Sequence, residues 1–419
     1  MSDVSARPSH PLASILARRF AVAWVFLLVS AVLGALLRLV PLVPMDLVVY
    51  GYVLHAHSHV AFLGWVFNAF FVVALRHFIP ADRACGYTRL WWILQIAVLG
   101  MLASFPAQGY GAVSIAFSTL HMAASAVFAW KLWRKNLAVP GARFFLRAAL
   151  VCMLVSGLGP LALGPLAALD LRDSPAYLLA IYFYLHFQFN GWFVFFLLAL
   201  WMQRGAEPGP RRVSAISGYS GWLLVAGGVL TYALSALWLA PPRWVYAVGL
   251  AGGILQLAGG AGLLAGLRPA AGGLGGGVSL LLLRIALGSL VLKMLLQVAA
   301  VMPGLSALAS QRFVVVAFIH LIFLGLVTPA LLRWAIDEGW LARGARRSTG
   351  IALYLTATIA TEMVLVTPTL LGMLGIPATL PIQPLLFGAS AVLVASVAVL
   401  GATLRTPVDD RGRQVPARE

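Results

Sequence analysis

The sequence predicts an all-α polytopic membrane protein with about twelve transmembrane helices. Of its 419 residues, 62% are hydrophobic and only 10% are charged, a balance that suits a lipid bilayer better than a soluble core. The apolar stretches can cross about 30 Å of hydrocarbon, which takes roughly 20 helical residues. Basic residues also gather in alternate loops, as expected when consecutive helices cross a membrane in opposite directions.

Proline, glycine and charged residues divide the apolar sequence into twelve predicted spans, at 20–43, 48–75, 90–107, 110–133, 143–168, 176–202, 214–239, 243–266, 278–302, 312–335, 349–374 and 380–404. Short loops make consecutive spans antiparallel neighbours. We expect one membrane domain over residues 1–419, with short tails at 1–19 and 405–419. Residues 268–277, RPAAGGLGGG, form the clearest flexible linker. Small residues in the eighth span predict close helix packing, and no internal repeat is evident.

The net charge of +17 reflects topology and does not indicate nucleic-acid binding. In a twelve-span arrangement most of the arginine and lysine falls on one side, which the positive-inside rule makes cytoplasmic. The sequence therefore predicts a protein of the cytoplasmic (inner) membrane with both termini inside. Cys85 lies in a loop and Cys152 in the fifth span, so neither a disulfide nor a thiolate metal site is indicated.

Six of the eight histidines lie within predicted spans two, four, six and ten: His55, His57, His59, His121, His186 and His320. Counted from the outer end of each span, they lie about seven to eleven residues deep, or roughly 10 to 17 Å. A single intramembrane histidine is often only a contact between helices. Six at one depth predict a functional site, because polar groups in lipid are costly and tend to mark proton paths, ion paths or cofactors.

Imidazole is a suitable ligand for iron, copper and zinc. At 100° per residue, His55 and His59 share one helix face and His57 points nearly the opposite way, so one helix can serve two sites. If His57 or His59 meets His320, the pair forms a bis-imidazole haem site. A second, non-haem metal or a substrate would then be held by the remaining histidines. Candidate metal ligands are therefore His55, His59, His121, His186 and His320.

Two basic residues at similar depth are candidates for the same haem site. Lys293 shares a helix face with Gln297, and a buried ammonium needs a partner, yet few acidic residues lie nearby. Arg38 ends the first span on the same side. Haem propionates would supply the missing negative charge to Lys293 or Arg38. The alternative for Arg38 is that its side chain reaches the lipid headgroups.

These features resemble subunit I of the haem-copper oxidases and nitric oxide reductases, which has twelve helices with histidine ligands on helices two, six and ten. The segments HSHVAFLG, from His57 to Gly64, and HLIFLG, from His320 to Gly325, also resemble segments of the NnrS family of membrane haem and copper proteins linked to nitric oxide stress. The architectural likeness covers the whole chain; the specific likeness covers these segments and YFYLHFQFNGWF, residues 182–193. It implies haem ligands at His57 or His59 and at His320, and a non-haem metal ligand at His186.

The chain departs from the oxidase pattern at several points. The tenth span offers a single histidine, no His-His pair follows the sixth span, and Asn190 stands four residues after His186 where an oxidase would have tyrosine. A complete oxygen-reducing centre is therefore not expected. The resemblance implies a haem b protein, with copper or another non-haem metal as a further option. It would handle or sense nitric oxide or oxygen, or transfer electrons from quinol, alone or with a partner redox subunit.

Two other functions remain open. Twelve spans fit a secondary transporter equally well, with the histidine cluster coupling transport to protons or binding a metal ion as cargo. A structural or assembly subunit is the third possibility. The optical spectrum of the purified protein separates haem binding from transport.

Overall fold

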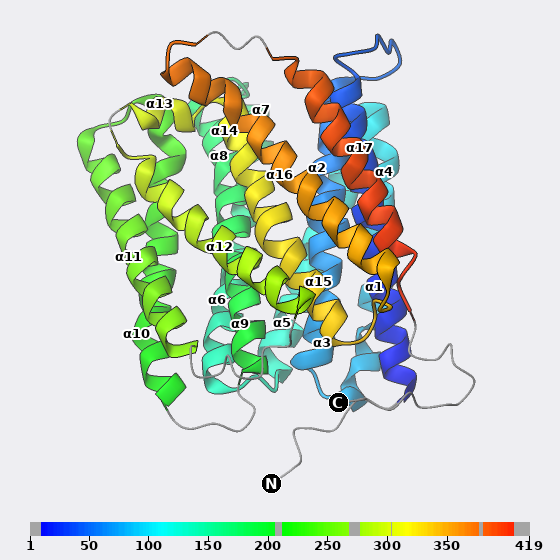
Figure 1. Cartoon of the computed structure of the whole chain (residues 1–419). Helices are drawn as coiled ribbons and strands as arrows, with labels where there is room; N and C mark the ends of the chain where they lie inside the picture. The colour runs from blue at the N-terminus through cyan, green and yellow to red at the C-terminus, as the bar shows by residue number, and fades with distance from the viewer. Residues whose placement is uncertain (1–9, 206–211, 268–276, 303, 377–379, 406–419) are drawn as a thin grey trace. The chain divides into compact units, whose positions relative to one another are not determined.

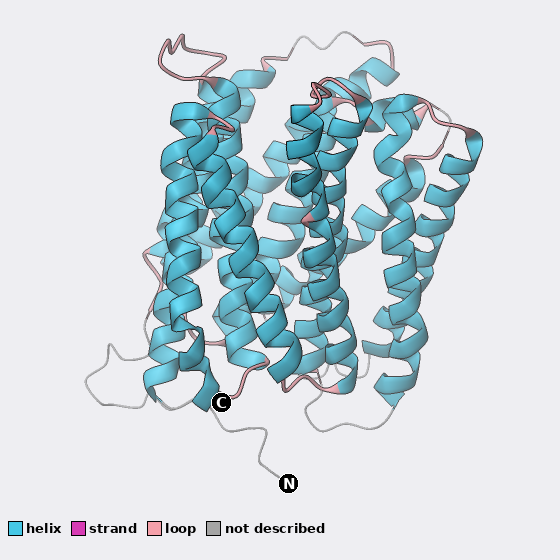
Figure 2. Ribbon diagram, turned by 180° about the vertical axis from the view of Figure 1, so that it is seen from behind, coloured by secondary structure: helices cyan, strands magenta, loops and turns pink. Residues whose placement is uncertain are grey.

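The computed structural model describes residues 10–205, 212–267, 277–302, 304–376 and 380–405. It is 85% helical, and the described residues form no strand (Figure 2). Twelve helices are long and apolar enough to cross a membrane. The predicted all-α polytopic membrane protein is therefore confirmed.

The twelve spans agree with the predicted ones to within a few residues at most ends. They are Leu12–Leu39, Tyr50–His77, Ala81–Gln108, Ala112–Lys135, Pro140–Ala168, Pro175–Arg204, Gly218–Leu239, Arg243–Ala265, Val278–Ala299, Arg312–Asp337, Ala345–Met373 and Ile382–Gly401. Most of the predicted linker, at 268–276, and most of the predicted tail, at 406–419, lie outside the described residues. The side of the membrane on which the termini lie remains a prediction.

The described chain forms two compact units. Of the described residues, the first comprises 10–128, 331–364 and 380–405. Its helices are α1 (His10–Leu39), α2 (Tyr50–His59), η1 (Val60–Phe67), α3 (Asn68–His77), η2 (Ala81–Tyr87), α4 (Thr88–Gln108), most of α5 (Ala112–Lys135), most of α15 (Thr328–Asp337), most of α16 (Ala345–Met373) and α17 (Ile382–Gly401).

The second unit comprises the described residues within 129–330 and 365–376. Its helices are α6 (Pro140–Ser156), α7 (Leu158–Ala168), α8 (Pro175–His186), η3 (Phe187–Phe193), α9 (Val194–Arg204), α10 (Arg212–Leu230), η4 (Thr231–Leu239), α11 (Arg243–Leu267), α12 (Val278–Ala299), α13 (Leu305–Ala309), α14 (Arg312–His320) and η6 (Leu321–Val327).

The first helix begins at His10, ten residues before the predicted span. The predicted span begins directly after the basic residues Arg18 and Arg19. In the structure the Arg19 side chain is buried, donates a hydrogen bond to Thr88 Oγ1 at 2.9 Å and lies over the ring of Trp91. Because the neighbouring helix satisfies this guanidinium, the charge does not end the helix.

Aromatic side chains form a core in the first unit. Phe20 and Trp24 of α1 contact Trp65 of η1, and Phe20 also contacts Trp334 and Trp340, with ring centroids 5.5 to 5.9 Å apart. Such tilted and edge-on pairs stabilise a core beyond the area that they bury. They join three segments that lie far apart in the sequence.

Glycines bring α10 and α11 into close contact in the second unit, where the two helices run side by side (Figure 1). A Cβ atom on Gly227 would lie 2.6 Å from the carbonyl oxygen of Gly252, and one on Gly259 would lie 2.7 Å from that of Ser220. Real Cβ atoms do not approach this closely. The close packing predicted from the small residues of the eighth span is therefore confirmed.

One ion pair stabilises the end of α15 in the first unit. Arg76 Nε of α3 donates to Glu338 Oε2 at 2.9 Å, and His77 Nε2 lies 3.4 Å from Glu338 Oε1. Burial acts to raise the pKa of the Glu338 carboxyl. The hydrogen bonds and charges of His77 and Arg76 outweigh burial and lower that pKa to about 2.

We predict that Glu338→Gln lowers the thermal stability of the detergent-solubilised protein at neutral pH. Because the pKa of Glu338 is lowered on folding, its contribution is complete above the ordinary pKa of 4.5 and is lost as the pH falls toward about 2. The difference in melting temperature between wild type and variant should shrink over that range. Asp82→Asn, which removes an exposed carboxylate from the same unit, is the control. A difference that stays constant with pH would contradict the ion pair.

Candidate functional site

Three spans share an unusual local element. In each, a histidine ends a regular α-helix, a π-helix follows at once, and a glycine stands five residues after the histidine. The elements are His59 with η1 and Gly64, His186 with η3 and Gly191, and His320 with η6 and Gly325. π-Helices account for well under about 1% of residues in proteins and are frequent at functional sites.

Each of these glycines lets its span pack closely against the preceding span. A Cβ atom on Gly64 would lie 2.9 Å from the Phe26 ring, and one on Gly325 would lie 2.6 Å from Ser289 Oγ. A Cβ atom on Gly191 would overlap the side chain of Cys152. The three spans are also the most buried of the twelve. In their apolar segments 78%, 83% and 61% of the residues are buried, against 28 to 50% in the other spans. Each of these three spans is therefore covered by other parts of the protein over most of its apolar segment.

This threefold element is an internal repeat that the sequence analysis missed. Its signal is present in the sequence as HVAFLG, HFQFNG and HLIFLG, at residues 59–64, 186–191 and 320–325. The three copies stand on spans two, six and ten, which are four spans apart. Three of the six positions are identical in all copies: the histidine, the phenylalanine at Phe62, Phe189 and Phe323, and the glycine. So short a match stands out only beside the π-helices.

The His57 ring lies against a row of α1 residues in the first unit. Its Nδ1 is 2.8 Å from the carbonyl oxygen of Ser30. A carbonyl can only accept, so Nδ1 carries the proton and Nε2 keeps its lone pair. One turn on, Gly34 makes room for the ring: a Cβ atom there would lie 3.0 Å from His57 Cε1. Arg38, another turn on, is close enough for its charge to act on His57.

His55 and His59 lie on the opposite face of α2, as predicted. Both rings contact Tyr110 and Phe105, with centroids 4.3 to 6.0 Å apart. The Nδ1 atom of His59 donates to the carbonyl oxygen of His55 at 2.8 Å, so His59 also keeps a lone pair on Nε2. The predicted placement of His55 and His59 on one helix face, with His57 on the other, is confirmed; that one helix serves two sites stays a prediction.

His121 of α5 is buried in the first unit against Phe67. The single proton of the Ser125 hydroxyl is used in a bond to the His121 carbonyl oxygen at 2.8 Å. His121 Nδ1, 3.1 Å from the same hydroxyl, must therefore donate to it. Within the described residues His121 Nε2 has no hydrogen-bond partner, so its lone pair is buried and unused.

His186 lies in the second unit, where both of its ring nitrogens are engaged. Nε2 donates to the carbonyl oxygen of Gly228 at 2.7 Å, and Nδ1 accepts from Asn190 Nδ2 at 3.1 Å. Gln297 Nε2 in turn donates to Asn190 Oδ1 at 3.3 Å. A metal could bind His186 only by displacing one of these partners. The role of metal ligand that the resemblance implies for His186 therefore finds no open coordination position in this arrangement.

Lys293 belongs to the same group of buried polar residues. Its Nζ donates to Gln256 Oε1 at 2.9 Å, and Gln256 Nε2 donates to Thr231 Oγ1 at 2.8 Å. The Thr231 hydroxyl lies within 3.1 Å of the Gly227 and Gly228 carbonyl oxygens. These carbonyls are available because α10 changes to the 3₁₀-helix η4 at Thr231, where the α-helical bonding pattern ends. The partner of Lys293 is thus an amide of the protein.

The predicted haem ligands fall in different units. His57 and His59 belong to the first unit and His320, half-buried at the end of α14, to the second. Pairing between them therefore stays a prediction. No group of three or more histidine, cysteine or acidic residues capable of holding a metal ion occurs in the part of the chain that the structure describes. The structure thus gives no support to a three-ligand centre built from the predicted metal ligands.

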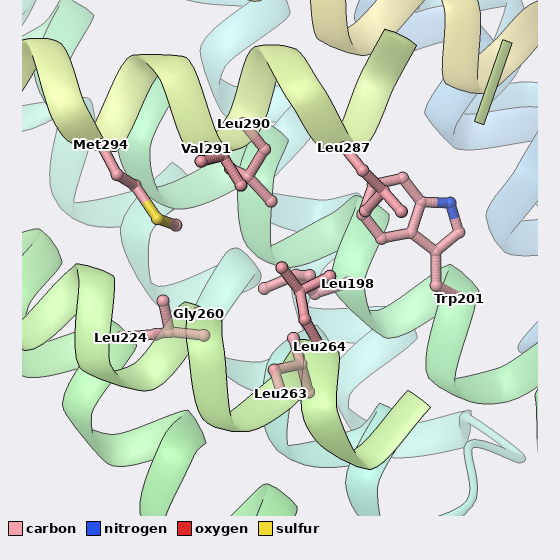
Figure 3. A pocket seen from close by; sticks show the side chains of 10 residues that line it. All are labelled: Leu198, Trp201, Leu224, Gly260, Leu263, Leu264, Leu287, Leu290, Val291 and Met294. Atoms are coloured by element: carbon pink, nitrogen blue, oxygen red, sulfur yellow. The ribbon is translucent and has the colours of Figure 1, made fainter. Parts of the chain in front are cut away.

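An apolar pocket lies between helices of the second unit. Ten residues from α9, α10, α11 and α12 line it, including Trp201, Leu224, Leu263 and Met294 (Figure 3). None carries a charge. The lining offers a metal ion no nitrogen or oxygen side-chain ligand, and its single sulfur is the thioether of Met294.

No family model matches the chain, and no curated protein matches it. The chemistry of the site therefore has to be argued from its own residues.

We predict that Asn190→Leu destabilises the second unit by about 1 to 3 kcal/mol, because it leaves the buried Nδ1 of His186 and Nε2 of Gln297 without partners. Unfolding of the detergent-solubilised protein in denaturant measures the change. The matched control is Gln311→Leu, which removes an exposed amide that accepts from Thr369 in the same unit. Equal effects of the two substitutions would show that the buried network contributes nothing.

Proposed function

We propose that the chain is a membrane-integral haem protein that binds haem b through His320 and either His57 or His59. It acts as an oxidoreductase or sensor for nitric oxide or oxygen, or transfers electrons from quinol, in the manner of divergent haem-copper oxidase and NnrS proteins. The bound iron would supply the redox chemistry. The chain supplies the axial nitrogens, an apolar surrounding and compensating charge. A partner redox subunit would complete electron delivery.

The observation that carries this proposal is the state of the two rings on α2. His57 and His59 each donate Nδ1–H to a backbone carbonyl, which holds the ring and leaves the Nε2 lone pair for another partner. Histidines that bind metals are held in this way by a hydrogen bond at the other nitrogen. His59 also stands directly before a π-helix, as His320 does. Both features fit axial ligands.

The row Ser30, Gly34 and Arg38 on α1 favours His57 of the two. Ser30 fixes the tautomer, and Gly34 makes room for the ring. Arg38 supplies a positive charge near the same ring, as a haem propionate requires. Of the two basic candidates, Arg38 and Lys293, we retain Arg38 for the haem propionate, because Lys293 already bonds Gln256 in the second unit.

Copper has less support from these residues. A non-haem copper centre needs several nitrogen ligands. His186 has both ring nitrogens in hydrogen bonds, and the buried lone pair of His121 is a single donor. We therefore carry no copper into the proposal.

The second candidate function is a secondary transporter coupled to protons or a metal ion. The polar network that joins Lys293, Gln256, Thr231, His186, Asn190 and Gln297 favours it. Buried ionisable residues of this kind are frequent at coupling sites in transporters. Colour separates the two functions, since a transporter of this kind needs no haem.

We predict that the protein purified from cells supplied with haem shows a Soret band and a haem b pyridine haemochrome. His320→Ala should abolish haem binding, and so should alanine at whichever of His57 and His59 is the second ligand. His186→Gln is the control and should retain haem, because both nitrogens of His186 bond within the protein. Unchanged haem content in His320→Ala would refute that ligand. A colourless wild-type protein would favour transport.

We predict that Gly34→Val lowers haem content or shifts the optical spectrum, because the new side chain displaces the His57 ring from Ser30. Gly51→Val is the matched control: it stands near the start of α2, where a Cβ atom meets nothing within 4 Å. Spectra and haem content of the two purified variants check the prediction. A wild-type spectrum in Gly34→Val, with full haem content, would remove His57 from the site and leave His59 as the ligand.

A further inference from the structure

The haem proposal leaves Lys293 unexplained. This side chain is only 1% exposed and lies in the interior of the span Val278–Ala299. Its only hydrogen bond within the described residues goes to Gln256 Oε1, a neutral acceptor. An ammonium group taken out of water without a counter-charge is costly, and ionisable residues inside membranes are usually functional.

No acidic residue occurs in the spans of the second unit. Their sequences, from Pro140 to Ala168, Pro175 to Arg204, Gly218 to Leu239, Arg243 to Ala265, Val278 to Ala299 and Arg312 to Ala330, contain neither aspartate nor glutamate. Asp170 and Asp173 of this unit lie in the connection between α7 and α8. Lys293 therefore has no carboxylate within these helices with which to form an ion pair.

The titratable groups around Lys293 are few. α11, which packs against α12, carries only Arg243 and Tyr246, both in its first turn. η6, which also packs against α12, carries none, and α14 before it carries Arg312 and His320 at its two ends. His186 of α8 is near enough for its charge and that of Lys293 to act on each other. Tyr232 of η4 contacts the His186 ring and donates its hydroxyl to the Leu179 carbonyl oxygen.

The hydrogen bonds around Lys293 suit both of its protonation states. Thr231 and the Gly227 carbonyl hold the Gln256 amide so that its oxygen faces Lys293. A neutral amine and an ammonium can each donate one N–H to that oxygen. One turn along the same face of α12, Gln297 Oε1 is buried and has no partner among the described residues. Because side chains at positions i and i+4 of a helix are neighbours, this oxygen is the candidate second acceptor for the additional N–H of the ammonium.

We propose that Lys293 is a proton-binding site inside the membrane domain, with Gln256 as its fixed hydrogen-bond acceptor and Gln297 as the acceptor added when the proton is bound. The amine nitrogen takes a proton through its lone pair and later releases it, with no other bond formed or broken. Proton binding at Lys293 does not depend on haem, so this proposal can be tested independently of the haem proposal.

The chain is well suited to a direct test, because Lys131, Lys135 and Lys293 are its only lysines. Full-length protein containing ¹³C,¹⁵N-lysine is placed in lipid nanodiscs and titrated by NMR between about pH 5 and about pH 10. Lys293→Met identifies the Lys293 signal by its loss, and Lys131→Met identifies one of the other two. We expect the Lys293 signal to titrate reversibly within this range, at a pH different from that of Lys131 and Lys135.

A second variant shows whether the network controls this proton. Gln256→Leu removes the fixed acceptor and should move the titration midpoint of Lys293 without changing those of Lys131 and Lys135. An unmoved midpoint would overturn the role of Gln256. A Lys293 signal that remains in one protonation state over the whole range, or that titrates together with the other two lysines, would overturn the proposal. Haem content plays no part in these readings.

Discussion

Every polar group within a membrane span must find its hydrogen-bond partner inside the protein, because lipid provides none. For three of the histidines within the spans the partner is a backbone carbonyl, whereas His121 Nε2 and Gln297 Oε1 have no partner among the described residues. His57, His59 and His186 each donate to one, and the Gly227 and Gly228 carbonyls become available where α10 changes to a 3₁₀-helix. The acceptors of His57 and His59 lie in regular α-helices, and that of His186 lies where α10 gives way to η4.

The same constraint distinguishes the two units. In the first unit the rings of His57 and His59 are held through one nitrogen, with the other left as a potential ligand. In the second unit His186 is held through both nitrogens and joins Asn190, Gln297 and the residues around Lys293. Ligand chemistry therefore fits the first arrangement, and proton chemistry fits the second. The role of His320 in the haem proposal rests instead on the family resemblance and on the π-helix that follows it.

Much of the fold could be predicted from the sequence, because length and hydropathy determine where helices can cross a bilayer. The opposite faces of His57 and His59 followed from helical periodicity alone. The buried position of Arg19 could not be predicted, since it depends on Thr88 and Trp91 from another helix. The partner of Lys293 was missed for the same reason: Gln256 and Lys293 meet only after α11 and α12 pack together.

The π-helix after His59 has a consequence for the whole second span. An α-helix rotates by about 100° per residue, and a π-helix, with more residues per turn, rotates by a smaller angle. Side chains after η1 therefore point in other directions than a continuous α-helix would give them. The residues before η1 can therefore direct His57 toward α1, while Asn68, just after η1, exchanges two hydrogen bonds of 3.0 Å with Gln95 of α4. This change of direction allows one continuous span to contact different neighbouring helices at two depths without a break in its backbone.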